Sequence, residues 1–370
     1  MSRATRLDLG ALASALILVA GCGPERIIRH QIVSAPHAVG CVPADCGDPR
    51  DQVSVTYLGI SGILVEHGGH VLLTAPFFSM PPLLSWRPGA LRWLTDRPIV
   101  PDTAVIERLL PRSADRASVI LVGHGHYDHL LDVPYIATHR TRSAIIFGSP
   151  SVRHMLMGDR VLRSSPSRVV AIPRNKAGDA DRYGDWFYSP DSAFRFMALV
   201  ADHAPNLKIG DWPFLFARGT LAADLDTLPR MAAAWKLGEP YAYLIDVLSN
   251  SPRRTIFRIY FEDAPSEPPL GFPPARLLAS GTVDLAILCA ATSSNVKATP
   301  DSLVRMLKPA GVMVTHWESF FRPALRPKRL SGATDMHMFV GSLRRSLPPR
   351  AGWVMPLPGQ TVRFRTTDRS

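Results

Sequence analysis

Several features are scarce in this 370-residue sequence, and each scarcity excludes a class of protein. It has only four cysteines, too few for a disulfide-rich scaffold. After one apolar stretch near the N-terminus there is no second long hydrophobic run, which excludes a protein with several membrane-spanning helices. Hydrophobic residues make up 46% of the sequence and charged residues 20%, so a folded domain with a large core is expected.

Basic residues outnumber acidic ones by 42 to 31, which gives a formal net charge of +11. Most are arginines scattered along the chain, without the basic stripe and interleaved aromatics that are typical of a nucleic-acid binder. We therefore expect no nucleic-acid partner. The positive charge is compatible with attraction to anionic lipid headgroups.

The first 21 residues have the pattern of an export signal. A basic start precedes an apolar stretch over residues 9–20, which is too short to span a bilayer comfortably. The sequence Leu-Val-Ala-Gly-Cys at 18–22 resembles the bacterial lipoprotein signal, which implies cleavage before Cys22 and a lipid anchor on that residue. Gly23 follows instead of the Asp that would disfavour the outer membrane. We expect a lipid-anchored envelope protein that faces the periplasm at the outer membrane; a plain secreted protein is the alternative.

Export also affects the interpretation of the other cysteines. Cys41 and Cys46 lie in a stretch with Pro and Gly, and in an oxidising compartment we expect them to form a disulfide. A metal half-site is the weaker alternative, because the sequence has no matching second pair. Cys289 lies in an apolar run, as expected of a small buried residue.

The pattern after the signal predicts a tether over 22–50, one domain over 51–360 and a C-terminal tail over 361–370. Short apolar runs bounded by turn residues predict β-strands, and amphipathic segments between them predict helices. The predicted strands are 53–59, 63–66, 71–73, 117–122, 144–148, 168–172, 194–201, 241–247, 255–262, 283–290 and 311–315. The predicted helices are 103–110, 129–138, 223–235 and 301–308. This alternation favours an α/β sandwich with the sheets inside, and the long segments 175–192 and 206–241 are candidates to cap a site.

The strongest local signal is the sequence His124-Gly-His126-Tyr-Asp128-His129, which directly follows an apolar strand. On an extended segment, side chains at i and i+2 point the same way, so His124 and His126 can converge on one ion. Asp128 and His129 stand where the next helix begins and can reach a second ion beside the first. Imidazole and carboxylate are ligands that zinc, manganese and iron accept.

Further candidate ligands follow three later predicted strands. His203, Asp263 and His316 each stand at the carboxyl end of a β run. Strand ends of this kind meet at one edge of an α/β fold, where such folds place their sites. Seven ligands exceed the four that satisfy a structural ion, which argues for a catalytic centre.

The order and strand context of these motifs resemble those of the metallo-β-lactamase-fold hydrolase superfamily over residues 51–360. The resemblance implies a four-layer αββα sandwich and two divalent metal ions, with zinc preferred and manganese or iron as alternatives. It implies the first ion's ligands as His124, His126 and His203, and the second's as Asp128, His129 and His316, with Asp263 bridging.

Within this superfamily, three elements look most like the branch that includes L-ascorbate-6-phosphate lactonase and N-acylphosphatidylethanolamine phospholipase D. They are the segment from Tyr57-Leu58-Gly59 to Pro76-Phe77-Phe78, the Tyr127 inside the motif, and Asp202-His203-Ala204-Pro205.

The chain departs from the family pattern at two places. Ala75 stands where the family usually has an Asp that supports the ligands, so a looser loop is expected there. Glu262 and Ala264 flank Asp263, where the family commonly has Gly before and Ser or Thr after. This departure bears on the orientation of the bridging carboxylate.

The predicted chemistry is metal-dependent hydrolysis. Two ions about 3.5–4 Å apart can hold a hydroxide between them, because coordination lowers the pKa of water towards about 7. Asp128 is the candidate catalytic residue that orients this nucleophile and relays its proton. The sequence predicts cleavage of a phosphodiester, ester or lactone bond in a small-molecule or lipid-like substrate.

Residues after the last histidine are candidate substrate contacts. Trp317 would give an apolar wall and Arg322 an anion contact, and the aromatic stretch 212–216 is a weaker candidate for the wall. Two alternatives to hydrolysis stay open: an iron-dependent oxidoreductase on the same fold, and a non-catalytic lipoprotein that binds metal.

Overall fold

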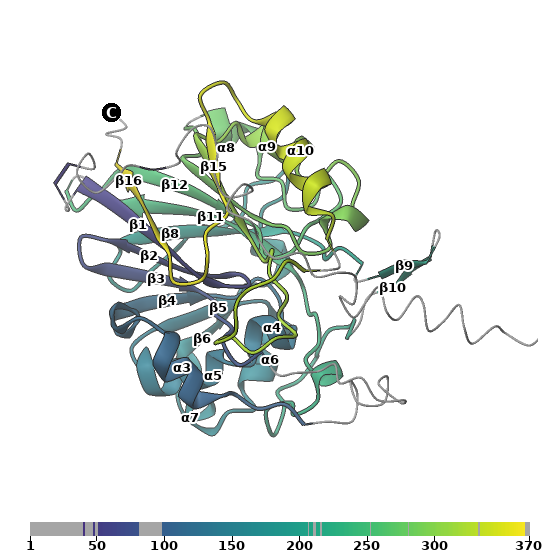
Figure 1. Cartoon of the computed structure of the whole chain (residues 1–370). Coiled ribbons are helices and arrows are strands. Elements are labelled where there is room, and N and C mark those ends of the chain that lie inside the picture. The colour runs from purple at the N-terminus through teal and green to yellow at the C-terminus, as the bar shows by residue number, and fades with distance from the viewer. Residues whose placement is uncertain are drawn as a thin grey trace, which may run out of the picture.

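The protein is described here by a computed structural model that covers residues 40, 47–48, 51–80, 98–205, 207–209, 212–214, 217–251, 253–279, 281–331 and 334–366. In these ranges two seven-stranded sheets pack face to face (Figure 1). The first contains, in spatial order, β16 (Thr361–Arg365), β1 (Gln52–Gly59), β2 (Gly62–His67), β3 (His70–Thr74), β4 (Ala117–Leu121), β5 (Ile145–Gly148) and β6 (Val169–Ala171). The second contains β15 (Gly352–Val354), β14 (Gly311–Thr315), β13 (Leu285–Cys289), β12 (Thr255–Phe261), β11 (Tyr241–Leu248), β8 (Phe194–Val200) and β7 (Phe187–Tyr188).

The first sheet is buried on both faces, and the alternation of its side chains divides the core into two parts. Ile63 and Val65 in β2 point to the second sheet, whereas Leu64 between them joins the cluster beneath the helices. The same alternation occurs in β4, where Val119 lies between the sheets and Ile120 faces the helices. A sheet covered on both sides needs continuous apolar runs, as these strands have.

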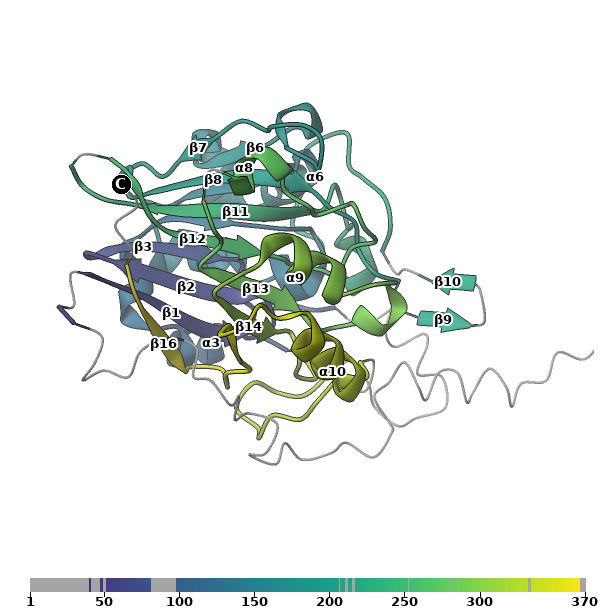
Figure 2. The same ribbon diagram turned by 90° about the horizontal axis from the view of Figure 1, so that it is seen from above.

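Helices cover the outer faces of both sheets (Figures 1 and 2). Those over the first sheet are α3 (Thr103–Leu109), α4 (Tyr127–Leu130), α5 (Val133–Tyr135), α6 (Pro150–Leu156) and α7 (Arg160–Ser164). Those over the second sheet are α8 (Ala275–Ala279), α9 (Asp301–Leu307) and α10 (Met336–Ser346). A separate hairpin consists of β9 (Leu207–Ile209) and β10 (Trp212–Phe214). Among the helices of the described ranges, none combines the length and apolar sequence needed to cross a bilayer.

The predicted four-layer αββα sandwich is confirmed, and each predicted strand is present within about two residues. The helices predicted over 103–110 and 301–308 are α3 and α9. The predicted end of the domain at residue 360 is too early. Residues 361–365 form β16, which pairs antiparallel with β1 from Gln52 to Thr56 and is the edge of the first sheet, not a tail.

The helix predicted over 223–235 is wrong, because only Ala232–Ala234 forms a 3-10 turn there. Pro229 interrupts the amphipathic pattern, and the backbone here is extended. Hydrogen bonds with other segments satisfy its polar groups. The amide of Leu225 donates to His154 O, and the guanidinium of Arg163 donates to the carbonyls of Leu225 and Asp226. The helix predicted over 129–138 is divided among α4, α5 and a π-helical turn over Ile136–Arg140.

The two candidate capping segments behave differently. Segment 175–192 contributes β7, which pairs with β8, so it forms the edge of the second sheet instead of a cap. Segment 206–241 contacts the histidine motif near its C-terminal end. There Leu237 O accepts a hydrogen bond from the amide of Gly125 (2.9 Å).

Strand direction places the candidate ligands at one edge. β12, β13 and β14 are parallel, and β8 runs the same way because both β8 and β12 are antiparallel to β11. The loops that follow β8, β12 and β14 therefore leave the second sheet at the same edge. The loop after β4 meets them there, since the amide of Tyr241 donates to Gly123 O (2.8 Å).

Candidate metal centre

Three histidines form a compact first trio at this edge. His124 and His126 lie in the segment after β4, and His203 lies in the loop after β8. Their ring centroids are 4.8 to 4.9 Å from one another, and one ligand nitrogen from each lies within 4.8 Å of the others. His203 Nδ1 donates to Ala204 O (2.6 Å), which leaves Nε2 as its ligand atom. The Nε2 atoms of His124 and His126 are buried without a hydrogen-bond partner among the described residues.

The charge state of this trio suits metal binding. Burial and the neighbouring His124 lower the pKa of His203 to about 3. Burial also lowers the pKa of His124, and the pKa of His126 lies well below its usual range for the same reason. The three imidazoles are therefore neutral near pH 7, which is the form that binds a metal ion.

A second trio consists of Asp128, His129 and His316. Asp128 Oδ2 lies 3.4 Å from His129 Nε2 and 3.5 Å from His316 Nε2. These distances are longer than good hydrogen bonds. They are close to the roughly 3.4 Å that separates two ligand atoms around a tetrahedral ion with bonds of about 2.0–2.1 Å. The second trio thus has the spacing of ligands around a common ion.

Asp263 connects the two trios. Its Oδ2 accepts a hydrogen bond from His124 Nδ1 (2.8 Å), and its Oδ1 lies 2.9 Å from His129 Nδ1 without the alignment of a hydrogen bond. Both contacts are made by Nδ1, so the Nε2 atoms face the other way. A carboxylate that binds the second nitrogen of a ligand histidine fixes its tautomer and orientation. In this geometry the Asp263 carboxylate contacts the two imidazole rings. To bridge two metal ions, its oxygens would have to leave these ring nitrogens and bind the ions instead.

The charges around Asp263 are strongly coupled. Burial alone would raise its pKa, but His129 and His124 outweigh burial and hold that pKa well below the usual range. His129 responds in the opposite direction. Burial disfavours its charge, yet Asp263 and Asp128 raise its pKa to about 10. In the metal-free protein, His129 is therefore protonated, and the two carboxylates on either side of its ring stabilise the positive charge.

A glycine makes room for the Asp263 carboxylate. A methyl group at Gly123 would overlap the Asp263 carboxylate, so glycine is required there by close approach. Glu262 is also fully buried beside Asp263, and burial raises its pKa to about 8. It is thus mainly neutral at pH 7 and adds little negative charge next to the centre.

A hydrogen-bond network that the sequence analysis missed fixes His316. The residue has a φ of 50°, which is costly for a non-glycine residue. Its amide hydrogen is shared by Ile60 O (2.8 Å) and the Tyr57 hydroxyl oxygen (3.1 Å). The Tyr57 hydroxyl donates to the buried Glu318, whose other oxygen accepts from the amide of Ile60 (3.0 Å). The only signal in the sequence was the proximity of Glu318 to His316, which does not distinguish a buried glutamate from an exposed one.

The loop at Ala75 is held by residues from other segments. Ala75 is buried, and its amide donates to Leu121 O (2.9 Å). Asp132, which was also missed, accepts hydrogen bonds from the amides of Phe78 (2.6 Å) and Ser79 (2.9 Å) and from the Ser79 hydroxyl. Asp132 therefore anchors this loop from the other side, and the expected loosening stays a prediction.

Aromatic side chains line one flank of the second trio. Phe320 lies 5.4 Å from His316 between ring centroids, and Phe321 lies 4.4 Å from Phe320. Tyr127 contacts Phe320 at 6.3 Å, and Phe77 contacts Tyr127 at 5.9 Å. Phe320, Phe321 and Tyr127 are only half-buried, so this group keeps surface for a ligand.

One predicted substrate contact is wrong. Trp317 has no exposed surface, and its indole N–H donates to Pro356 O (3.0 Å), so it is part of the core. Arg322 is half-buried directly after the aromatic pair, and its role as an anion contact stays a prediction. Cys22, Cys41, Cys46 and the side chains of 212–216 lie outside the described residues, whereas Cys289 is a free, buried cysteine as expected.

Comparison with known proteins finds solved structures that resemble this chain. No protein-family model matches the sequence, and no match was found among curated proteins. Igni18, a metallo hydrolase from Ignicoccus hospitalis, is 14% identical and aligns over 85% of this chain and 100% of its own, with a TM-score of 0.48. YhfI of Bacillus subtilis, a metallo-beta-lactamase fold protein, is 11% identical over 85% and 99% (TM-score 0.44). CmlA of Streptomyces venezuelae, a diiron beta-hydroxylase, is 15% identical over 86% and 55% (TM-score 0.46).

The pKa of His129 predicts how metal binding depends on pH. Since this pKa is raised to about 10, the proton is bound at every pH below that value, and an ion must displace it. The apparent zinc affinity of the second trio should rise about tenfold per pH unit between pH 6 and 8. Competition with a chromogenic chelator at several pH values measures this slope. A constant affinity over this range would contradict the prediction.

The network around His316 predicts the effect of Tyr57→Phe. Loss of the hydroxyl removes a donor to buried Glu318 and an acceptor for the His316 amide. We expect a loss of about 1–3 kcal/mol in unfolding free energy. We also expect about 10–100-fold weaker binding of one metal ion. Tyr260→Phe is the matched control, because its buried hydroxyl donates to a backbone oxygen, Gly271 O (2.9 Å), that belongs to neither trio. Equal metal affinities in the two variants would refute the positioning role.

Proposed function

We propose that this protein is a metal-dependent hydrolase with a dinuclear centre. The observation that carries the proposal is that the two trios each offer three donor atoms at metal-binding spacing and share the contacts of Asp263. Structural zinc sites are usually closed by four protein ligands, whereas catalytic sites keep a position open for water or substrate. Two adjacent three-donor sites therefore favour catalysis over a purely structural role.

Zinc is the preferred ion for this donor set of imidazoles and carboxylates, with manganese and iron as alternatives. Such ions, when bound, lower the pKa of coordinated water and polarise a carbonyl or phosphoryl oxygen. The protein's residues then orient the reacting groups. Burial opposes ionisation of Asp128, but His129 and His316 outweigh it and hold its pKa well below the usual range, so Asp128 is ionised and able to accept a hydrogen bond.

The surroundings of the centre favour a substrate with an apolar part beside the scissile bond. Phe320, Phe321 and Tyr127 form a half-exposed aromatic flank next to His316. Arg322 follows this flank and suits an anionic group. We propose a phosphodiester, ester or lactone of lipid or envelope material, in keeping with the L-ascorbate-6-phosphate lactonase and phospholipase D branch that the sequence resembles.

The site of action is proposed from the N-terminal sequence. The segment Leu-Val-Ala-Gly-Cys at 18–22 supports lipid attachment at Cys22 and a position at the outer membrane, facing the periplasm. A lipid anchor would keep the aromatic flank near substrates from the same membrane.

The proposal predicts that the purified protein binds two zinc or manganese ions and hydrolyses at least one compound in a panel of phosphodiesters, esters and lactones. Asp128→Asn should lower kcat by about 100-fold or more, because one donor and the ionised acceptor are lost. Asp224→Asn is the control, since Asp224 is an exposed partner of Arg153. Redox turnover with bound iron, or a metal-loaded protein without any hydrolysis across the panel, would overturn the proposal.

A separate prediction concerns the anchor. Cys22→Ser should move the protein from the membrane fraction to the soluble fraction or stop its processing, because the residue that receives lipid is missing. Cys289→Ser is the control, since Cys289 is buried in the domain. Immunoblots of fractionated cells and labelling with a fatty-acid analogue measure the change. Unchanged labelling of the Cys22 variant would contradict lipid attachment at this residue.

A further inference from the structure

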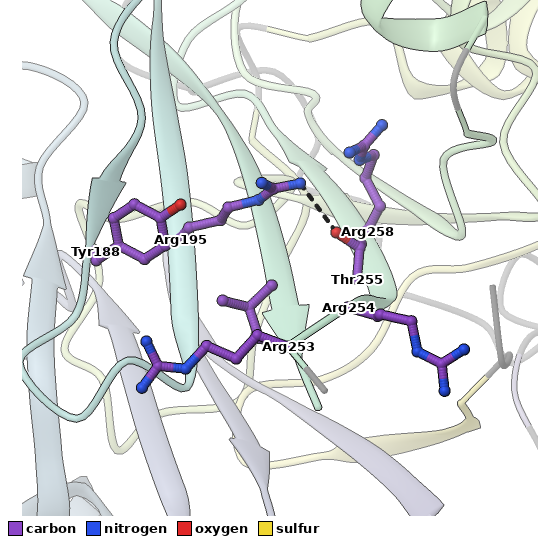
Figure 3. Close-up of a pocket in the computed structure, with 7 residues that line it drawn as sticks. Tyr188, Arg195, Arg253, Arg254, Thr255 and Arg258 are labelled. Carbon is purple, nitrogen blue, oxygen red and sulfur yellow. Dashed lines mark hydrogen bonds between the residues drawn. The ribbon is translucent and has the colours of Figure 1, made fainter. Parts of the chain in front are cut away.

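A cavity of about 490 Å³ lies at the end of the second sheet where β12 begins, and Figure 3 shows the residues that line it. Its lining residues are Tyr188, Arg195, Leu248, Arg253, Arg254, Thr255 and Arg258. Thr255 is the first residue of β12, and Asp263 follows the last residue, Phe261. Six strand steps of about 3.3 Å separate these ends by roughly 20 Å. The cavity is therefore distinct from the metal centre.

An ion-pair ladder across three neighbouring strands forms the floor of this cavity. Asp246 in β11 faces Arg195 in β8 on one side and Arg258 in β12 on the other. The carboxylate is fully buried and accepts from Arg195 Nε (2.8 Å), Arg258 Nε (2.6 Å) and Arg258 Nη2 (3.0 Å). One buried carboxylate thus holds two guanidinium groups close together, which their mutual repulsion would otherwise prevent.

Arg195 is held by two further contacts. Its Nη2 donates to the Thr255 hydroxyl (3.1 Å), the contact drawn in Figure 3, and its guanidinium lies 4.4 Å from the centroid of the Trp186 ring. A cation fixed in this way loses little conformational freedom when it binds an anion. Arg195 is still about one quarter exposed, with 28% of its side-chain surface accessible.

The lining of the cavity is rich in arginine. Four of its seven residues are arginines and none is an Asp or Glu, while Asp246 beneath them pairs with Arg195 and Arg258. Arg253 and Arg254 lie exposed in the β11–β12 turn at the rim. A concave site lined by several guanidinium groups attracts anions, and the guanidinium fork matches the oxygens of a phosphate group.

We propose that this cavity binds a phosphate-bearing anion, supplied either as a free phosphate or as the phosphodiester of a lipid headgroup. The buried ladder of Arg195, Asp246 and Arg258 fixes the floor of the site, and Arg253 and Arg254 stand at its rim. A volume of about 490 Å³ accommodates a phosphate together with an organic substituent. The site is independent of hydrolysis at the metal centre.

Calorimetric titration of the purified, chelator-treated protein tests this proposal, because removing metal ions prevents phosphate from binding to an ion at the two trios. Inorganic phosphate is one probe, and dihexanoylphosphatidylglycerol below its micelle concentration is the other, both at constant ionic strength in chloride. We expect binding of at least one probe. Binding of phosphate alone assigns a free phosphate, and binding of the phosphodiester assigns a headgroup.

Variants at the rim locate the binding. Arg253→Ala combined with Arg254→Ala should weaken the bound probe at least tenfold and leave the buried ladder in place. Arg142→Ala combined with Arg160→Ala is the matched control, since it removes the same charge from exposed positions in the other half of the domain and should change the affinity less than twofold. Failure of both probes to bind, or equal losses in the two double variants, would overturn the proposal.

Discussion

The buried carboxylate of Asp263 is the contact on which the metal centre depends. It holds the Nδ1 atoms of His124 and His129, one histidine from each trio, and so turns the Nε2 atoms of both rings in the opposite direction. The same carboxylate draws a proton onto His129 in the metal-free protein. Charge that is buried at this depth is stable only with such partners. Binding of ions would replace that proton with a larger positive charge at the same place.

The fold brings this carboxylate and its partners together from both sheets. His124 and His129 follow β4 in the first sheet, whereas Asp263 and His203 follow strands of the second. Neither sheet alone contains a complete trio of ligands, since His316 also comes from the second sheet and joins Asp128 and His129. The centre therefore lies where the two layers meet, and its geometry depends on their packing.

The sequence was sufficient to predict the layers and the clustering of the ligands. Apolar runs such as 117–122 define buried strands, and a histidine or aspartate directly after a strand lies at a predictable edge. It was not sufficient for interactions that depend on three-dimensional packing. Tyr57 and Glu318 are 261 positions apart in the chain, and nothing in either local pattern indicates that they meet. Trp317 was misassigned because an aromatic residue beside a ligand has the same local signature in a core as in a pocket.

Pairing of β1 with β16 joins the two ends of the domain. Thr56 and Thr361 share a hydrogen bond across 305 positions of the chain. The outer edge of β1 is therefore covered only when a strand from the far end of the domain is added, and contacts this distant in sequence form slowly. Until then β1 presents an open row of backbone donors and acceptors, the type of edge that recruits strands from other molecules. Residues 361–365 thus cover an edge that would otherwise be open to self-association during folding.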